Sequence, residues 1–267
     1  MGFGERLVEA GERHGRLCVG IDPHAALLEQ WGVGDTVEGL RTFSRTCVEA
    51  FAGHVALVKP QVAFFERFGS KGFAVLEETL GALRASGTLV VADAKRGDIG
   101  STMEGYARAW LGTGSPLEVD AVTLTPFLGV GSLDPAIDLA QAGGKGVFVM
   151  AANSNPEAER FQSQRIGGVS IAQQMVDACA AYNTGRGIGD VGVVVGATVA
   201  SPPDLRALNA PVLMPGVGAQ GASFADVDRI AGDRAGLFFP NVSRGVLKEG
   251  PDVDKLRECA VALSRHP

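Results

Sequence analysis

The sequence lacks an excess of basic residues. It contains 267 residues, with 24 Lys and Arg against 30 Asp and Glu, which gives a formal net charge of −6 at pH 7. Proteins that bind nucleic acid usually carry a basic surface that neutralises phosphate groups. Nucleic acid is therefore not an expected partner.

Long apolar runs are also missing. Residues 1–16 are polar and charged, without the apolar segment of a signal peptide. No stretch reaches the roughly 18 consecutive apolar residues that are needed to span a bilayer. The sequence therefore predicts a cytoplasmic protein that has no membrane partner.

Cysteine and histidine are scarce and do not cluster. The cysteines are Cys18, Cys47, Cys179 and Cys259. No two of them form a C-x-x-C pair, so we predict neither a zinc site nor a disulfide framework, and we expect buried free thiols. Among the four histidines only His24 lies close to a candidate site residue, Asp22. Serine-protease chemistry and Cys–His chemistry are therefore not predicted.

Eight short apolar runs alternate with longer segments along the chain. Each run is apolar almost throughout, as expected for strands that are covered on both faces in a parallel sheet. The runs are Leu17–Ile21, Ala56–Lys59, Leu89–Ala92, Ala121–Leu124, Gly146–Met150, Gly192–Val195, Val212–Met214 and Gly236–Phe239. The segments between them show helical spacing. In Phe73–Ser86, for example, apolar residues recur at intervals of three and four before Gly87.

This alternation predicts the fold class. Eight strands separated by helices over about 240 residues indicate an α/β protein, a (β/α)8 TIM barrel that forms a single domain over residues 1–267. A doubly wound sheet would more often contain about five or six strands. Two connections look like long loops, Pro126–Gly144, which contains a short amphipathic piece at Asp134–Gln141, and Asn153–Gly168.

Polar residues follow most of the predicted strands. Asp22 follows the first run, Lys59 ends the second, Ser154 follows the fifth, and Asn241 and Arg244 follow the eighth. Each of them alone would be an ordinary loop residue. The loops at the carboxyl ends of barrel strands form the active site, however, so their joint placement predicts a polar site there.

Three charged residues follow the third run at short spacing. Asp93 and Lys95 are two residues apart, so their side chains point to the same face of a strand, and Asp98 follows within reach of the same rim. Carboxylates around an ammonium group favour its charged form, which suits Lys95 as a proton donor or an electrostatic anchor. Lys59 would extend this group into an array of alternating charges. The alternative is an ion pair that only closes the top of the barrel.

The segment 216–221 reads Gly-Val-Gly-Ala-Gln-Gly, which matches the pattern G-x-G-x-x-G. In a dinucleotide-binding fold this pattern follows the first strand, and an acidic residue comes about 20 positions later. Here the pattern follows the seventh run, and the eighth leads to Asn241 and Arg244, so the only dinucleotide interpretation left open is a site for NADP. In a barrel the loops after strands seven and eight bind phosphate, which explains the glycines and Arg244 together.

Six segments of the chain together resemble one enzyme family. They are LCVGIDPH (17–24), VKPQVAFFE (58–66), DAKRGDIGST (93–102), ANSNP (152–156), MPGVGAQG (214–221) and NVSRG (241–245). This set resembles the orotidine 5′-phosphate decarboxylases, and in particular the longer (type 2) of their two main subgroups. The element D-x-K-x-x-D followed by Ile-Gly-Ser-Thr is specific to the superfamily. The resemblance implies decarboxylation of orotidine 5′-phosphate to uridine 5′-phosphate, the last step of de novo pyrimidine nucleotide synthesis, with no metal and no other cofactor.

The resemblance also implies roles for the charged residues. Lys95 would donate the proton to C6 of the pyrimidine, and Asp93 would lie against the substrate carboxylate. Lys59 and Asp98 would complete a tetrad of alternating charges. Asp98 would act, together with Ile99 and Thr102, in the site of the neighbouring subunit, so the resemblance implies a homodimer with sites at its interface.

The remaining implied contacts bind the substrate. Asp22 and Lys59 would contact the ribose hydroxyls, Ser154 would bind the edge of the pyrimidine, and Gln220 and Arg244 would contact the phosphate. The resemblance places Pro215 in the same pocket. The connections after the fourth and fifth runs are longer than in the compact subgroup, which leaves open the residue that orients the base beside Ser154.

Two alternatives remain open at this point. A related barrel uses the same D-x-K-x-x-D element to hold Mg²⁺ in a sugar-phosphate decarboxylase or epimerase. A non-catalytic nucleotide-binding barrel would keep the phosphate-binding loops but would have no need of Asp93, Lys95 and Asp98.

Overall fold

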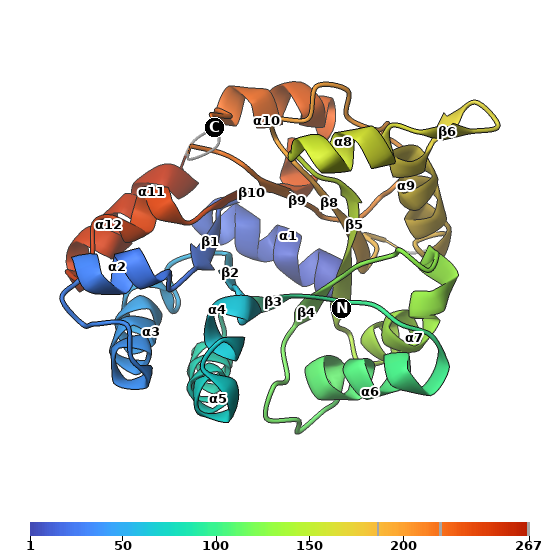
Figure 1. Cartoon of the computed structure of the whole chain (residues 1–267). Helices are drawn as coiled ribbons and strands as arrows, with labels where there is room; N and C mark the ends of the chain where they lie inside the picture. Colours follow the sequence, from blue (N-terminus) through green and yellow to red (C-terminus); the bar gives the residue numbers. More distant parts are fainter. Residues whose placement is uncertain (186, 219–220, 266–267) are drawn as a thin grey trace.

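The computed structural model describes residues 1–185, 187–218 and 221–265 (Figure 1). Eight parallel strands close into a barrel in the order β1-β10-β9-β8-β5-β4-β3-β2. They are β1 (Cys18–Ile21), β2 (Leu57–Pro60), β3 (Leu89–Arg96), β4 (Ala121–Leu124), β5 (Gly146–Ala152), β8 (Val191–Val195), β9 (Val212–Pro215) and β10 (Phe238–Val242). The predicted (β/α)8 barrel is therefore confirmed, and each of the eight apolar runs contributes a strand.

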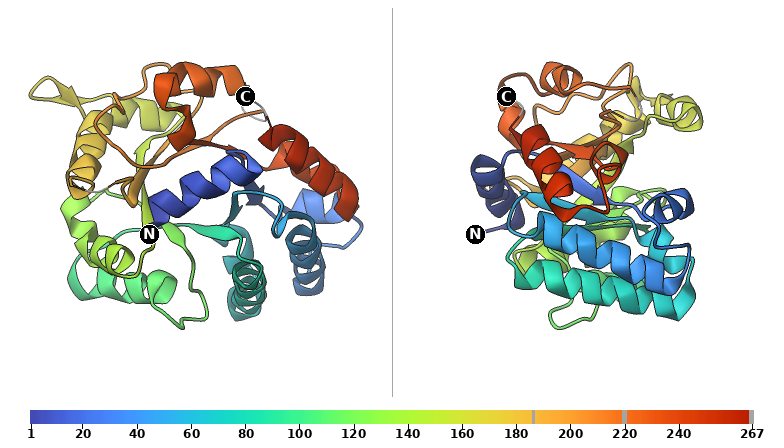
Figure 2. Two further views of the ribbon diagram at one scale, coloured as in Figure 1. Left: turned by 180° about the vertical axis from the view of Figure 1, so that it is seen from behind. Right: turned by 90° about the vertical axis from the view of Figure 1, so that its left-hand side faces the viewer.

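Helices surround the barrel in the order of the sequence (Figures 1 and 2). After β1 to β4 come α2 (Ala25–Gln30), α3 (Val37–Phe51), α4 (Val62–Glu66), α5 (Gly69–Ala85), α6 (Gly100–Leu111), the 3₁₀ helix η1 (Val130–Leu133) and α7 (Asp134–Ala142). After β5 come α8 (Pro156–Gln162), the antiparallel pair β6 (Arg165–Ile166) and β7 (Val169–Ser170), and α9 (Ile171–Tyr182). After β9 and β10 come α10 (Phe224–Ala231), the 3₁₀ helix η2 (Gly232–Leu237), α11 (Arg244–Leu247) and α12 (Val253–Ser264). The connection from β8 to β9, residues 196–211, is fully described and contains no helix.

The apolar side chains form two separate cores. The larger core lies between the strands and the surrounding helices. The smaller one fills the inside of the barrel, as barrel strands require when their side chains point alternately inward and outward. Helix α1 (Phe3–His14) lies across one end of the barrel (Figure 2). There the ring of Phe3 packs edge-on against Phe148, with 5.8 Å between ring centres. Because α1 closes this end, the functional site is left to the opposite end.

Two local predictions were wrong. We expected a loop over Asn153–Gly168, but this connection contains α8 and the strand β6, and β7 follows directly after it. Helix α8 has no buried residue, so it shows no apolar periodicity in the sequence. The eighth strand was expected at Gly236–Phe239, but it begins only at Phe238, because the preceding residues belong to η2, and it continues to Val242. Asn241 therefore lies within this strand and not after it.

Other local expectations are confirmed. Helix α5 contains most of the predicted Phe73–Ser86, and Gly87 follows its end with a φ of +78°, a conformation that glycine adopts without strain. The helical piece expected at Asp134–Gln141 is α7. All four cysteines are free, although Cys259 is only partly buried. In the described part of the chain, no helix is both long enough and apolar enough to cross a bilayer.

Candidate active site

A pocket of about 450 Å³ opens at the carboxyl ends of the barrel strands. This volume lies in the range that is typical of sites for small molecules. Seven of the residues singled out in the sequence line it, and they come from six different strand ends: Asp22, Lys59, Asp93, Lys95, Ser154, Pro215 and Arg244. The closed barrel therefore brings together residues that lie as much as 222 positions apart in the chain, from Asp22 to Arg244.

Asp93 is the centre of the charged part of this pocket. Its Oδ2 accepts hydrogen bonds from Nζ of Lys59 at 2.7 Å and from Nε2 of Gln61 at 2.9 Å. Its Oδ1 accepts from Nζ of Lys95 at 2.5 Å and from the hydroxyl of Thr123 at 3.0 Å. Both oxygens of one carboxylate are thus held by two ammonium groups and two neutral donors. The order Lys59–Asp93–Lys95 that the sequence predicted is present within the chain.

The pKa values of Asp93 and Lys59 are set by burial and by the charges next to them. Burial by itself would raise the pKa of Asp93, but the ammonium groups of Lys59 and Lys95 outweigh it and hold that pKa below its usual value. Burial would likewise lower the pKa of Lys59, yet Asp93 and Asp22 raise it above the usual value for lysine. Asp93 is therefore a carboxylate and Lys59 an ammonium group at neutral pH. The side chain of Lys95 is 42% exposed, against 5% for Lys59, so Lys95 is the cation that faces the open pocket.

Asp98 does not join this array within its own chain, so the group of three charges expected on one rim is not formed. Beyond Arg96 the chain leaves the barrel, and the Asp98 carboxylate accepts a hydrogen bond from the backbone N–H of Ile99 at 2.8 Å. Ile99 is 61% exposed, Thr102 is exposed on α6, and neither of them lines the pocket together with Lys95. None of these three residues lines the pocket of this chain.

Next to Lys59, the ends of β1 and β10 carry polar groups without a hydrogen-bond partner. Among the described residues, Oδ1 of Asp22 and Oγ of Ser243 are buried without a hydrogen-bond partner. Ser243 packs closely against the backbone of Gly20, and only glycine allows this, because a Cβ at position 20 would lie 2.7 Å from Cβ of Ser243. Arg244 lines the same wall and makes no ion pair within the described ranges. Gln220, which was expected to bind phosphate beside Arg244, lies outside the described residues.

His24, which lies two residues after Asp22 in the sequence, also lines the pocket. Its ring packs against Phe64, with 4.2 Å between ring centres. Burial lowers the pKa of His24, Asp22 opposes that shift, and the nearby Arg244 and Arg67 lower the pKa further. His24 is therefore a neutral ring at pH 7, beside the polar wall of the pocket.

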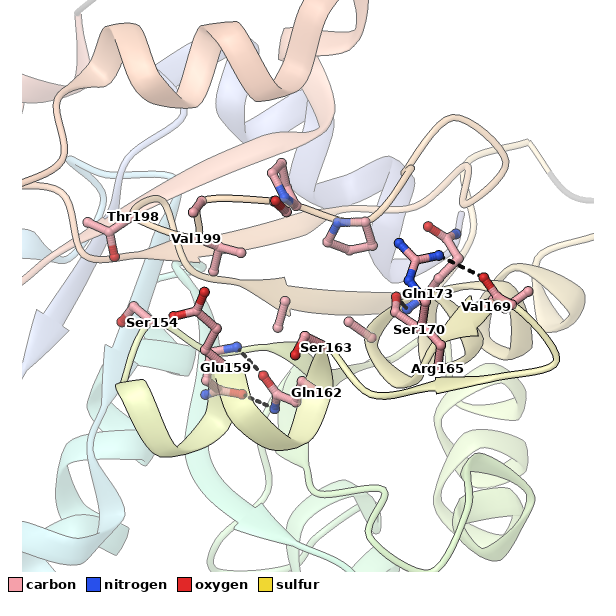
Figure 3. Close-up of a pocket in the computed structure, with 18 residues that line it drawn as sticks. Ser154, Glu159, Gln162, Ser163, Arg165, Val169, Ser170, Gln173, Thr198 and Val199 are labelled. Atoms are coloured by element: carbon pink, nitrogen blue, oxygen red, sulfur yellow. Dashed lines mark hydrogen bonds between the residues drawn. The ribbon is translucent and has the colours of Figure 1, made fainter.

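A second hollow of about 470 Å³ adjoins the pocket and shares Asn153 and Ser154 with it. It lies between α8 and the connection that follows β8, with Glu159 and Gln162 on one side and Thr198 and Val199 on the other (Figure 3). Gln162 accepts a hydrogen bond from the N–H of Asn153 at 2.7 Å and donates one to its side chain at 3.0 Å. Helix α8 therefore holds the segment that presents Ser154.

Sequence reasoning missed three residues that contact or support the site. Gln61 and Thr123 bind Asp93, and Gln162 holds Asn153. Gln61 had a usable signal, because it comes two residues after Lys59, on the same face of the chain. Thr123 and Gln162 had none, because their neighbours are separated from them in the sequence and are brought close only by folding.

Fold and site together define a barrel enzyme with an acid–base site at the carboxyl ends of its strands. A sequence model of the "Orotidine 5′-phosphate decarboxylase / HUMPS family" matches residues 15–259, and the chain belongs to this family. The resemblance that six short segments indicated is therefore confirmed. A dinucleotide-binding fold is excluded by the closed barrel.

Individual relatives agree with this assignment. A curated orotidine 5′-phosphate decarboxylase of Corynebacterium efficiens is 62% identical over 260 residues, which cover 96% of this chain and 93% of the relative. Another, of Streptomyces coelicolor, is 55% identical over 262 residues, covering 97% and 94%. A solved structure from Streptomyces avermitilis, provisionally described as the same enzyme, has a TM-score of 0.95 at 53% identity and covers 98% of this chain and 93% of that one.

Proposed function

We propose that this chain decarboxylates orotidine 5′-phosphate to uridine 5′-phosphate, the last step of de novo pyrimidine nucleotide synthesis. The observation that carries the proposal is the carboxylate of Asp93, held between the ammonium groups of Lys59 and Lys95 in the pocket. The polar wall with Asp22 and Arg244 supplies an acceptor for ribose hydroxyls and a cation for phosphate. Ser154 and Pro215 line the same pocket and would contact the base.

The chemistry requires a fixed cation at one carbon atom. Loss of CO₂ from C6 leaves an electron pair in the plane of the ring, and no carbonyl group can delocalise it. The ammonium group of Lys95 is already ordered by Asp93, so it stabilises the developing charge without reorganisation and then donates its proton to C6. Asp93 remains ionised throughout, because its pKa lies below the usual value.

The charge network disfavours the magnesium-dependent alternative. Each oxygen of Asp93 already accepts a hydrogen bond from an ammonium group, and a bound Mg²⁺ would have to displace at least one of these cations. An ultraviolet assay of the purified protein with orotidine 5′-phosphate tests the proposal. We expect turnover that is unchanged after incubation with a chelator. No turnover of this substrate, or turnover that disappears with the chelator, would reject it.

We also propose that the protein is a homodimer and that each subunit contributes Asp98, Ile99 and Thr102 to the site of its partner. All three lie outside the pocket of their own chain, and Ile99 exposes 61% of a large apolar side chain, which an interface with a partner would bury. The same proposal places the protein in the cytoplasm, where its four free cysteines would remain reduced.

Mixed dimers test the shared site. Lys95→Ala and Asp98→Ala chains are each expected to be nearly inactive alone, whereas their heterodimer should recover about half of the wild-type activity. The recovery arises because one of the two hybrid sites receives an intact Lys95 and an intact Asp98 from different chains. The control pairs Lys95→Ala chains with chains that carry both substitutions, and it should show no recovery. Verified heterodimers without activity would mean that each subunit builds its own site.

A further inference from the structure

The strand that carries Asp93 and Lys95 is irregular where these two residues lie. Strand β3 pairs with β4 through Ala92 opposite Val122 and then through Arg96 opposite Leu124, so four steps on β3 match two steps on β4. Such a bulge removes backbone groups from the regular ladder of hydrogen bonds and re-aims the side chains within it. Lys95 lies inside the bulge with a φ of +48°, a left-handed conformation that a lysine rarely adopts.

Thr123, on β4, faces the bulge and is 1% exposed. Its hydroxyl oxygen accepts a hydrogen bond from the backbone N–H of Lys95 at 2.9 Å, and the same hydroxyl donates to Oδ1 of Asp93 at 3.0 Å. A hydroxyl group has one proton to donate, so these two contacts set the orientation of the O–H bond of Thr123. One buried atom therefore binds the backbone of Lys95 and the carboxylate that orients the Lys95 ammonium group.

We propose that Thr123 is a positioning residue for decarboxylation: its hydroxyl holds the left-handed backbone of Lys95 and the Asp93 carboxylate in a single arrangement. This inference rests on the proposed role of Lys95 as proton donor. Thr123 lines the pocket, and the inference is that it places the ammonium group at the reacting carbon through its two hydrogen bonds. Thr125 supports the other side of the bulge, where its hydroxyl donates to the backbone carbonyl of Lys95 at 3.2 Å.

Position 123 requires a side chain that can both accept and donate a hydrogen bond. Valine has nearly the same shape but cannot accept from the N–H of Lys95, and it would remove the hydrogen bond that this group makes in the wild-type chain. Serine keeps the hydroxyl and loses only a methyl group. The pair Thr123→Val and Thr123→Ser therefore separates the hydroxyl group from the volume of the side chain.

The test is the steady-state kinetics of both variants with orotidine 5′-phosphate. For Thr123→Val we expect kcat to fall about 10- to 100-fold, because small displacements of a reacting group have effects of this size. KM should change by less than about threefold, because the substrate-binding wall is untouched. Thr123→Ser should keep kcat within about fivefold of the wild type, since it retains both hydrogen bonds.

The matched control is Thr79→Val on α5. Thr79 is also buried, and its hydroxyl donates to the backbone carbonyl of Val75 at 2.7 Å, far from the barrel mouth. This variant should keep wild-type kcat. If Thr123→Val does not fold, as judged by its thermal unfolding, Thr123→Ala repeats the test, because alanine also removes the hydroxyl group and places no methyl group in the position of the hydroxyl.

Several outcomes would overturn the inference. They are an unchanged kcat in a folded Thr123→Val or Thr123→Ala variant, an equal loss in Thr123→Ser, and an equal loss in Thr79→Val. A failure of the proposed function looks different, because the wild-type protein would then not turn over orotidine 5′-phosphate. A failure of the proposed role of Lys95 would appear as activity retained in Lys95→Ala. An inactive Lys95→Ala together with a fully active Thr123→Val would reject only the role of Thr123.

Discussion

Replacing Lys95 by alanine should abolish decarboxylation, with kcat lower by at least about 10⁴-fold. The side chain is proposed to supply both the proton for C6 and the fixed charge beside it, and each of these contributions is typically about 10²-fold or more. The fold should survive, because Asp93 keeps its hydrogen bonds from Lys59, Gln61 and Thr123. Turnover measured by ultraviolet absorbance, together with thermal unfolding, checks both statements.

Lys71→Ala is the control for this substitution, since Lys71 lies exposed on α5, away from the pocket. It should have wild-type activity. A folded Lys95→Ala protein that keeps more than about one hundredth of the wild-type kcat would show that another group protonates C6. The charge network around Asp93 would then be structural.

Removing the guanidinium group of Arg244 should have the second largest effect. Arg244 follows β10 and lines the polar wall of the pocket, so we expect it to bind the phosphate of the substrate. Binding energy from such a remote group orders the substrate in the transition state, and its loss lowers kcat as well as affinity. We expect kcat/KM for orotidine 5′-phosphate to fall about 30- to 150-fold in Arg244→Ala, which corresponds to about 2–3 kcal/mol for a charged hydrogen bond.

Orotidine, the same substrate without its phosphate, gives the decisive comparison. It should be a poor substrate of the wild-type enzyme, and Arg244→Ala should have little additional effect on its turnover, because both changes delete the same interaction. Arg13→Ala, on α1 at the closed end of the barrel, should behave as wild type with either substrate. An equal loss with orotidine and with its phosphate would show that Arg244 does not act through the phosphate.

Much of the architecture was predictable because the barrel strands are buried on both faces. Every residue of β1, β2, β4 and β8 is buried, so these strands appear in the sequence as continuous apolar runs. Polar residues at the ends of such runs, such as Asp22 and Lys59, then mark the mouth of the barrel. Helix α8 gave no comparable signal, since it packs no apolar face against the core.

The sequence by itself determined the barrel, the family and seven of the residues that line the pocket. All of these depend on local patterns, namely apolar runs, turn glycines and charged residues two positions apart. Only the tertiary structure decided which donors hold Asp93 and where Asp98 lies. The contact from Thr123 depends on the register of β4 against the bulge in β3, and that register is set by closure of the whole barrel. Asp98 is close to Lys95 in sequence, but the chain leaves the barrel between them and carries its carboxylate out of the pocket.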